Sequence, residues 1–282
     1  MKKIILILLG IGLFMSVAQG EVKPVRILTS FYPVYIMAMN VTDGVPGVIL
    51  ENLTRPMTGC LHDYSATPDD MKRIAHADIF IANGLGMESF LDQAVKTNSR
   101  LAVVITTKGI KPFQDNAHVW VNVALAQTQV QNLADGLAKY DPVHAALYHK
   151  NADRYVAKLQ KLETKMQQEL APFHGTAIIT FHEAFPYFAQ EFGLKIATVI
   201  EREPGSEPSA RELVDTIKII RNHKARAIFT EPQYSGTAAN TIAAETHIPV
   251  YVLDPAVTGA YDKDAYLNIM RANLLTLKKA LK

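Results

Sequence analysis

Three histidines and one aspartate each follow a short apolar run in a different part of the chain. They are His62, His118, His182 and Asp254. Imidazole nitrogens and carboxylate oxygens are common ligands of divalent transition metals. Side chains at the carboxyl ends of parallel strands meet at one edge of a sheet, so these four residues could converge on one ion. The pattern predicts a metal site.

The intervals between these residues exclude a small zinc module. Zinc fingers and ribbons hold their ligands close together in sequence. Here each neighbouring pair is separated by the length of several strands and helices. Such ligands meet only when the tertiary structure has formed. We therefore expect the metal in a cleft between large structural units.

Cys60 is the only cysteine of the chain, and it lies two residues before His62. No disulfide can therefore form within the chain. A thiolate could serve as a metal ligand. A single cysteine is more commonly a small buried apolar residue, which is the role that we favour for Cys60.

The composition indicates an exported globular protein. Lys2 and Lys3 precede an apolar run over residues 4–15 and small residues up to Gly20, which is typical of a cleavable secretory signal over residues 1–20. The apolar run is too short to favour a membrane span. With 49% hydrophobic residues the chain can bury a large core. Its net charge of +2 includes both leader lysines, so no basic excess remains to attract nucleic acid.

Short β-branched runs alternate with longer amphipathic stretches from residue 25 onward, as in βα units with parallel sheets. We expect strands over residues 26–29, 47–51, 78–82, 101–106, 177–181, 195–199, 226–230 and 250–253. We expect helices over residues 34–41, 68–75, 87–97, 123–140, 184–192, 209–223, 236–246 and 264–281. This order predicts an α/β protein with two similar lobes, each with a mainly parallel sheet.

One long amphipathic helix should join the two lobes. Asp141 is a suitable N-cap, Pro142 takes the first helical position, and Pro172 ends the segment. Apolar residues recur between them at spacings of three and four, and no Gly or Pro interrupts the pattern. A helical hairpin is the alternative, but we favour a single helix of about 45 Å. The predicted division is residues 24–140 for the N-terminal lobe, 141–171 for the helix and 172–282 for the C-terminal lobe.

Motifs around the candidate ligands resemble those of the extracytoplasmic solute-binding proteins that deliver zinc or manganese to ABC importers. They are His62-Asp63-Tyr64-Ser65, His118-Val119-Trp120, Phe181-His182-Glu183-Ala184-Phe185, Thr230-Glu231-Pro232-Gln233 and Leu253-Asp254-Pro255. The resemblance covers residues 24–282. It implies two α/β lobes on a backbone helix, with the metal held between the lobes by His62, His118, His182 and Asp254.

The resemblance also implies a periplasmic carrier that captures Zn²⁺ as transported ligand and delivers it to an inner-membrane ABC permease. We expect the carrier to be a monomer. Manganese-type relatives usually have Glu at the third ligand position, so His182 favours zinc over Mn²⁺, the alternative cargo. An adhesin or a storage protein would share the same site, so these roles stay open.

The chain departs from the zinc-type pattern around the second histidine. Residues 109–117 are few and contain no histidine, where zinc-type relatives often carry a long insertion rich in histidine and acids. Asn116-Ala117 replaces the usual Asp-Pro before His118, and Asn122-Val123 replaces the usual Ser-Pro after it.

Two further acids belong to the candidate site. Glu231 ends its own strand and could orient an imidazole, line the cleft or replace Asp254 as a ligand. Glu183 is adjacent to His182 and is a second candidate for a group that contacts a ligand, although a solvated acid at a helix start is the alternative.

A secreted zinc hydrolase is the main alternative from another class of protein. His182-Glu183 begins like the H-E-x-x-H signature, but Pro186 stands where the second histidine is required. A transport site surrounds zinc with protein ligands, whereas a catalytic zinc keeps one position for water. Four candidate ligands favour a carrier that catalyses no reaction.

Overall fold

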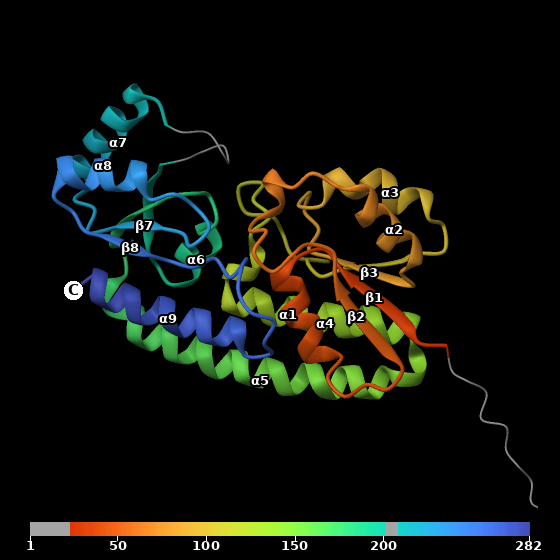
Figure 1. Ribbon diagram of the computed structural model, residues 1–282. Coiled ribbons are helices and arrows are strands. Elements are labelled where there is room, and N and C mark those ends of the chain that lie inside the picture. Colours follow the sequence, from red (N-terminus) through yellow and green to blue (C-terminus); the bar gives the residue numbers. More distant parts are fainter. Residues whose placement is uncertain (1–22, 201–207) are drawn as a thin grey trace, which may run out of the picture.

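The computed structural model describes residues 23–200 and 208–282. Figure 1 shows two lobes side by side along one long helix, as predicted. The predicted leader over residues 1–20 lies outside the described residues. In the part of the chain that the structure describes, no helix is long and apolar enough to cross a membrane.

The N-terminal half forms a four-stranded parallel sheet with strand order β2-β1-β3-β4. Its strands are β1 (Val25–Thr29), β2 (Val48–Asn52), β3 (Ile79–Ala82) and β4 (Ala102–Ile105). Its helices are α1 (Tyr32–Val41), η1 (Leu61–Asp63), α2 (Pro68–His76), η2 (Ser89–Leu91), α3 (Asp92–Thr97), η3 (Val119–Val121) and α4 (Val123–Tyr140). Successive strands are added on opposite sides of β1, so the strand order changes direction between β1 and β3. Ligands of open α/β sheets commonly bind at the carboxyl ends of the strands at such a point.

The predicted helix over residues 87–97 is wrong in its first turn. The structure has η2 and then the short α3 instead. Gly84 and Gly86 have positive φ, and the carboxylate of Glu88 accepts hydrogen bonds from the backbone of Asn83 and Gly84. These bonds fold the chain into a tight loop, so the helix begins later than the apolar pattern suggests.

The C-terminal half repeats the arrangement with strand order β6-β5-β7-β8. Its strands are β5 (Ala177–Thr180), β6 (Lys195–Val199), β7 (Ile228–Thr230) and β8 (Val250–Val252). Its helices are η5 (Ala171–Phe173), α6 (Pro186–Glu191), α7 (Ala210–His223), α8 (Thr237–Thr246) and α9 (Ala265–Ala280). The two parallel sheets confirm the predicted α/β class with two similar lobes.

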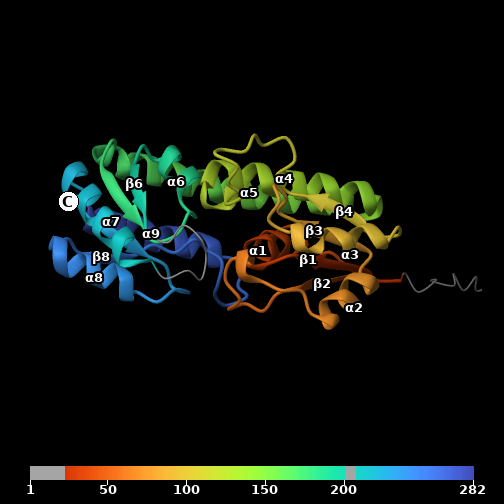
Figure 2. The ribbon, with the colours of Figure 1, turned by 90° about the horizontal axis from the view of Figure 1, so that it is seen from above.

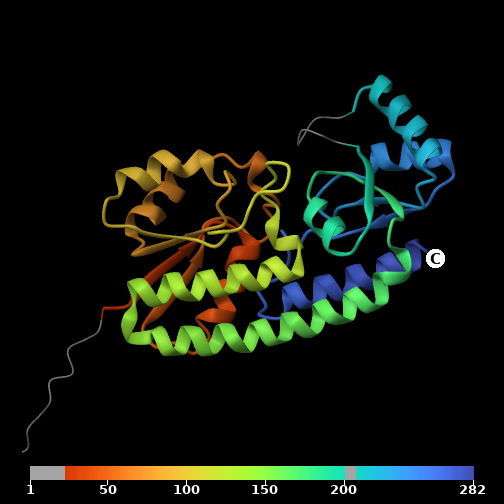
Figure 3. The ribbon, with the colours of Figure 1, turned by 180° about the vertical axis from the view of Figure 1, so that it is seen from behind.

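A single helix, α5 (Ala145–Leu170), runs under both lobes after the short η4 (Pro142–His144), so the hairpin alternative is wrong. The stripe of apolar residues that predicted α5 is buried. Figure 2 shows α4 beside one end of α5, and Figure 3 shows α9 beside the other. Since α9 also packs on α1, the C-terminal helix contacts the N-terminal half. The predicted boundaries between the N-terminal lobe, the linking helix and the C-terminal lobe, at residues 140 and 172, stay a prediction.

Trp120 joins the two halves near their sheets. Its side chain is fully buried and meets Phe31 edge to face, with ring centroids 5.0 Å apart. Its Nε1–H donates to the carbonyl of Pro255 at 2.7 Å, and its own carbonyl accepts from the Tyr266 hydroxyl at 2.7 Å. The main hydrophobic core contains residues of both halves. A continuous core of this kind favours small movements of the lobes.

Candidate metal centre

His62 lies in the connection between β2 and α2, which includes η1. Thr67 caps α2, because its backbone N–H donates to Asp70 Oδ2 at 2.8 Å and its side chain accepts from the Asp70 N–H. The Tyr64 hydroxyl donates to the same Asp70 oxygen at 2.8 Å. Leu61 is buried beneath the loop. These contacts hold η1, and with it His62, at the carboxyl end of the N-terminal sheet.

His118 lies just before η3 and is buried. Its Nδ1 is 2.9 Å from Oδ1 of Asn116, which also accepts the His118 backbone N–H at 2.8 Å. An amide oxygen can only accept, so Nδ1 carries the proton and Nε2 keeps its lone pair. The lone pair of Nε2 is therefore available to a metal.

Asn116 also connects the lobes. Its Nδ2 donates to the backbone carbonyl of Glu183 at 2.7 Å, next to His182. This bond fixes the orientation of the amide, with its oxygen toward His118. Asn116 was one of the departures from the family pattern, and its amide can bridge the lobes because it has both a donor and an acceptor.

His182 follows β5 in the C-terminal lobe and is buried. Its ring centroid lies 5.0 Å from that of His118 and 5.7 Å from that of His62. The His62 and His118 rings are themselves 5.0 Å apart. The structure thus brings together three of the four predicted ligands, and they come from three loops and both lobes.

The distance between His62 and His118 suits a shared ion. Their Nε2 atoms are 3.3 Å apart. Two nitrogen ligands of a tetrahedral zinc, each about 2.05 Å from the metal, are about 3.3 Å from each other. A cavity of about 310 Å³ opens beside them, and its lining includes all three histidines, Met87, Asp115 and Glu183.

The electrostatics of His118 favour metal binding. Burial, and then the neighbouring charges of His182 and His62, hold the pKa of His118 well below its ordinary value. A neutral imidazole binds metal, whereas an imidazolium does not. His118 is therefore ready to bind a metal without first losing a proton.

The predicted acids have different surroundings. Glu231 is buried, and its Oε1 lies 3.6 Å from Nδ1 of His182. Asp254 is half-buried after β8, where its Oδ1 accepts the Ala256 N–H at 2.8 Å. Burial raises the pKa of Asp254 to about 6, and the charge of Glu231 adds to this rise. Glu183 is exposed. Whether Asp254 or Glu231 completes the ligand set stays a prediction.

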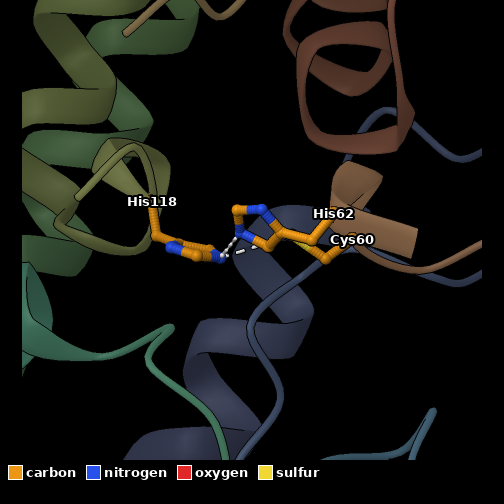
Figure 4. Close-up of side chains that lie close together, drawn as sticks. All are labelled: Cys60, His62 and His118. Atoms are coloured by element: carbon orange, nitrogen blue, oxygen red, sulfur yellow. Dashed lines mark hydrogen bonds between the residues drawn. The ribbon is translucent and has the colours of Figure 1, made fainter. Parts of the chain in front are cut away.

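Cys60 is buried, with 5% of its surface exposed, which agrees with the favoured apolar role. Its Sγ nevertheless lies 3.3 Å from Nε2 of His118. Figure 4 shows Cys60 and His62 extending from one loop toward His118 on the other side of the site. The only signal of this proximity in the sequence was the position of Cys60 two residues before His62.

The model of a known family, the periplasmic component A of zinc-uptake complexes (ZnuA), matches residues 27–280. The chain belongs to this family. A relative, the high-affinity zinc uptake system protein ZnuA of Bacillus subtilis, is 29% identical over 289 residues, which cover 94% of this chain and 90% of that protein. Zinc-binding protein AdcA of Streptococcus pyogenes is 27% identical over 98% of this chain, which spans only 61% of AdcA.

Solved structures of the same fold include proteins bound to other metals. The SBP FpvC from Pseudomonas aeruginosa in complex with Mn²⁺ has a TM-score of 0.84 and 27% identity over 92% of this chain and 98% of that chain. The laminin binding protein Lmb of Streptococcus agalactiae, described as both adhesin and metal transporter, has a TM-score of 0.83 and 26% identity over 92% of this chain and all of that chain. The relatives confirm the resemblance and the two-lobed solute-binding fold.

Proposed function

We propose that this protein captures Zn²⁺ between its lobes and delivers it to an inner-membrane ABC permease. The observation that carries the proposal is the convergence of His62, His118 and His182 on one cavity. Three imidazoles suit zinc better than manganese, which prefers oxygen ligands. The name of the family and those of its zinc-binding relatives support this cargo.

The three imidazoles form the main part of the proposed ligand set. Asp254 is the fourth ligand predicted from the sequence, and Glu231 is its alternative. The position of Glu231 beside His182 supports a role in orienting that imidazole. Glu183 is proposed to lie outside the ligand set, because its side chain is exposed.

The proposed carrier works in the periplasm after its leader over residues 1–20 has been removed. It acts as a monomer and catalyses no reaction. A protein that fills the positions around zinc with its own side chains leaves none for a reacting water.

The first test is elemental analysis of protein purified from its native periplasm without added metal. Stoichiometric zinc supports the proposal. Stoichiometric manganese would identify Mn²⁺ as the transported metal instead, the ion that the related FpvC binds in its solved structure. An ion with a water-filled position and hydrolytic activity would assign an enzyme.

The second test concerns delivery. Cells that lack this chain should take up less ⁶⁵Zn at low external zinc, and the wild-type chain should restore uptake. His182→Ala should fail to restore it, whereas His174→Ala, which changes a histidine outside the cluster, should succeed. Restoration by His182→Ala would contradict the proposed function.

A further inference from the structure

Cys60 lies inside the histidine cluster rather than only beneath it. Its Sγ is 3.3 Å from Nε2 of His118. The Sγ atom and one ring nitrogen from each of His62 and His118 all lie within 4.8 Å of one another. Cys60 and His62 come from the same loop, and Figure 4 shows both side chains directed at His118.

The distance from the sulfur to His118 suits two ligands of one zinc ion. With a Zn–S bond of about 2.3 Å and a Zn–N bond of about 2.05 Å, sulfur and nitrogen on a tetrahedral zinc are about 3.5 Å apart. The observed 3.3 Å between Sγ and the His118 nitrogen is close to this value. The observed 3.3 Å between the two histidine nitrogens also fits the same tetrahedron.

The buried polar groups around the sulfur independently indicate a ligand. Asn116 holds the proton of His118 on Nδ1, so the lone pair of Nε2 points toward Cys60 and His62. His182 is 3% exposed, and its Nδ1 has no hydrogen-bond partner in the described structure. This nitrogen lies 3.6 Å from Oε1 of Glu231, so a metal bound at the other ring nitrogen, Nε2, would leave the Nδ1–H to donate to that carboxylate.

We propose that Cys60 is a ligand of the transported metal and binds it through Sγ together with His62, His118 and His182. This inference rests on the proposed function. When the metal binds, the S–H bond breaks, the proton leaves to solvent and an Sγ–metal bond forms. The lone pair of His118 Nε2 binds the same ion, and no electron is transferred.

A thiolate ligand restricts the metal ions that the site would bind tightly. Soft sulfur favours Zn²⁺ and other thiophilic ions such as Cd²⁺ over Mn²⁺, whose preferred ligands are oxygens. The ligand atoms of Cys60, His62 and His118 lie within 4.8 Å of one another, and the His182 ring would move closer to them to complete a tetrahedron. The carboxylates of Asp254 and Glu231 then act from outside the coordination sphere.

X-ray absorption at the zinc edge of the wild-type, zinc-loaded protein tests the proposal directly. We expect one sulfur at about 2.3 Å beside nitrogen at about 2.0–2.1 Å. A first shell of nitrogen and oxygen alone would overturn the role of Cys60 and leave the proposed function standing. Failure to load stoichiometric zinc would overturn both.

Variants test the effect on selectivity. Cys60→Ala should weaken Zn²⁺ binding by at least about 100-fold, since loss of a ligand should exceed the 10–100-fold effect of outer groups. Its Mn²⁺ affinity should change by less than about threefold. Thr58→Ala, in the same loop, should leave both affinities unchanged. Equal losses for both metals in Cys60→Ala would overturn the proposed selectivity.

A cobalt spectrum gives a separate readout. The Co²⁺-loaded wild type should show a near-ultraviolet thiolate-to-cobalt charge-transfer band, and Co²⁺-loaded Cys60→Ser should lack it. Circular dichroism of each variant checks that it is folded. A wild-type cobalt complex without the charge-transfer band would overturn the ligand role.

Discussion

The carboxylate of Glu231 lies 3.6 Å from Nδ1 of His182, and neither Glu231 Oε1 nor that nitrogen has a hydrogen-bond partner in the described residues. Both side chains are almost fully buried. The separation exceeds that of a normal hydrogen bond, so a shift of a few tenths of an ångström would form one. When His182 binds metal through Nε2, its Nδ1–H can donate to Glu231, as outer carboxylates commonly accept from metal-bound imidazoles.

Glu231→Gln should weaken zinc binding by about 10–100-fold, because the variant keeps the shape of the side chain but loses its charge. Competition with a chromophoric zinc chelator measures the affinity. Glu183→Gln, at an exposed acid, is the matched control. A wild-type affinity in Glu231→Gln would exclude a role beside His182, and a loss as large as that of His182→Ala would make Glu231 a direct ligand.

His182→Ala should lower zinc affinity by more than about 100-fold, and Glu183→Ala by less than about threefold. The two residues are adjacent in sequence, yet His182 is buried in the cluster and the Glu183 side chain is exposed. Titration calorimetry of both variants checks the difference. Equal losses would mean that this loop does not bind metal through His182.

Asn116→Ala should weaken zinc binding by about 10–100-fold, since it removes the acceptor that fixes the ring of His118. Asn116→Asp keeps the acceptor but loses the amide donor to the Glu183 carbonyl. Its affinity should therefore lie between those of Asn116→Ala and the wild type. An affinity of Asn116→Ala equal to that of the wild type would show that the ring needs no such support.

Zinc affinity should fall on acidification, because protons compete with metal for the ligands. The pKa of His118 is held well below its ordinary value, so this ring keeps its metal-binding form as the pH drops. Burial raises the pKa of Asp254 to about 6, so its carboxylate is neutralised first. We expect the decline mostly below about pH 6. Calorimetry from pH 5 to 8 tests this, and a constant affinity would contradict it.

Glu191 should make the stability of the protein depend on pH. Its carboxylate accepts the N–H groups of Val123 and Ala124 at the start of α4, and burial raises the pKa of Glu191 to about 8. The unfolded carboxyl titrates near about 4.3. As the pH rises, the carboxyl of Glu191 therefore ionises in the unfolded chain before it ionises in the folded protein. Its contribution to the free energy of unfolding is complete below about pH 4 and is lost as the pH rises through about 8.

Urea unfolding of the metal-free protein at about pH 5 and pH 9 measures this effect. Glu191→Gln cannot ionise at this position, so its free energy of unfolding should change less between the two conditions. Glu245→Gln, at an exposed acid in α8, is the control. The same pH dependence in Glu191→Gln and the wild type would rule out the contribution of Glu191.

Most elements of the fold could be predicted because burial patterns are local. The helix α5 buries one stripe, and the same periodicity appears in the sequence. Strands such as β3 are buried along their whole length and appear in the sequence as short apolar runs. The capping box of Thr67 and Asp70 is equally local. The first turn of the helix predicted over residues 87–97 failed because Glu88 bonds back to the preceding loop, and apolar periodicity does not register such a bond.

By itself the sequence determined the fold class and singled out three histidines as candidate metal ligands, because each of His62, His118 and His182 follows from a short motif and its place after a strand. Only the tertiary structure decided which groups surround them. It put the sulfur of Cys60 near His118, bridged the lobes through Asn116 and set Glu231 beside His182. These relationships join residues from distant loops, and differences of less than an ångström between such loops decide whether a side chain binds a metal, supports a ligand or only packs.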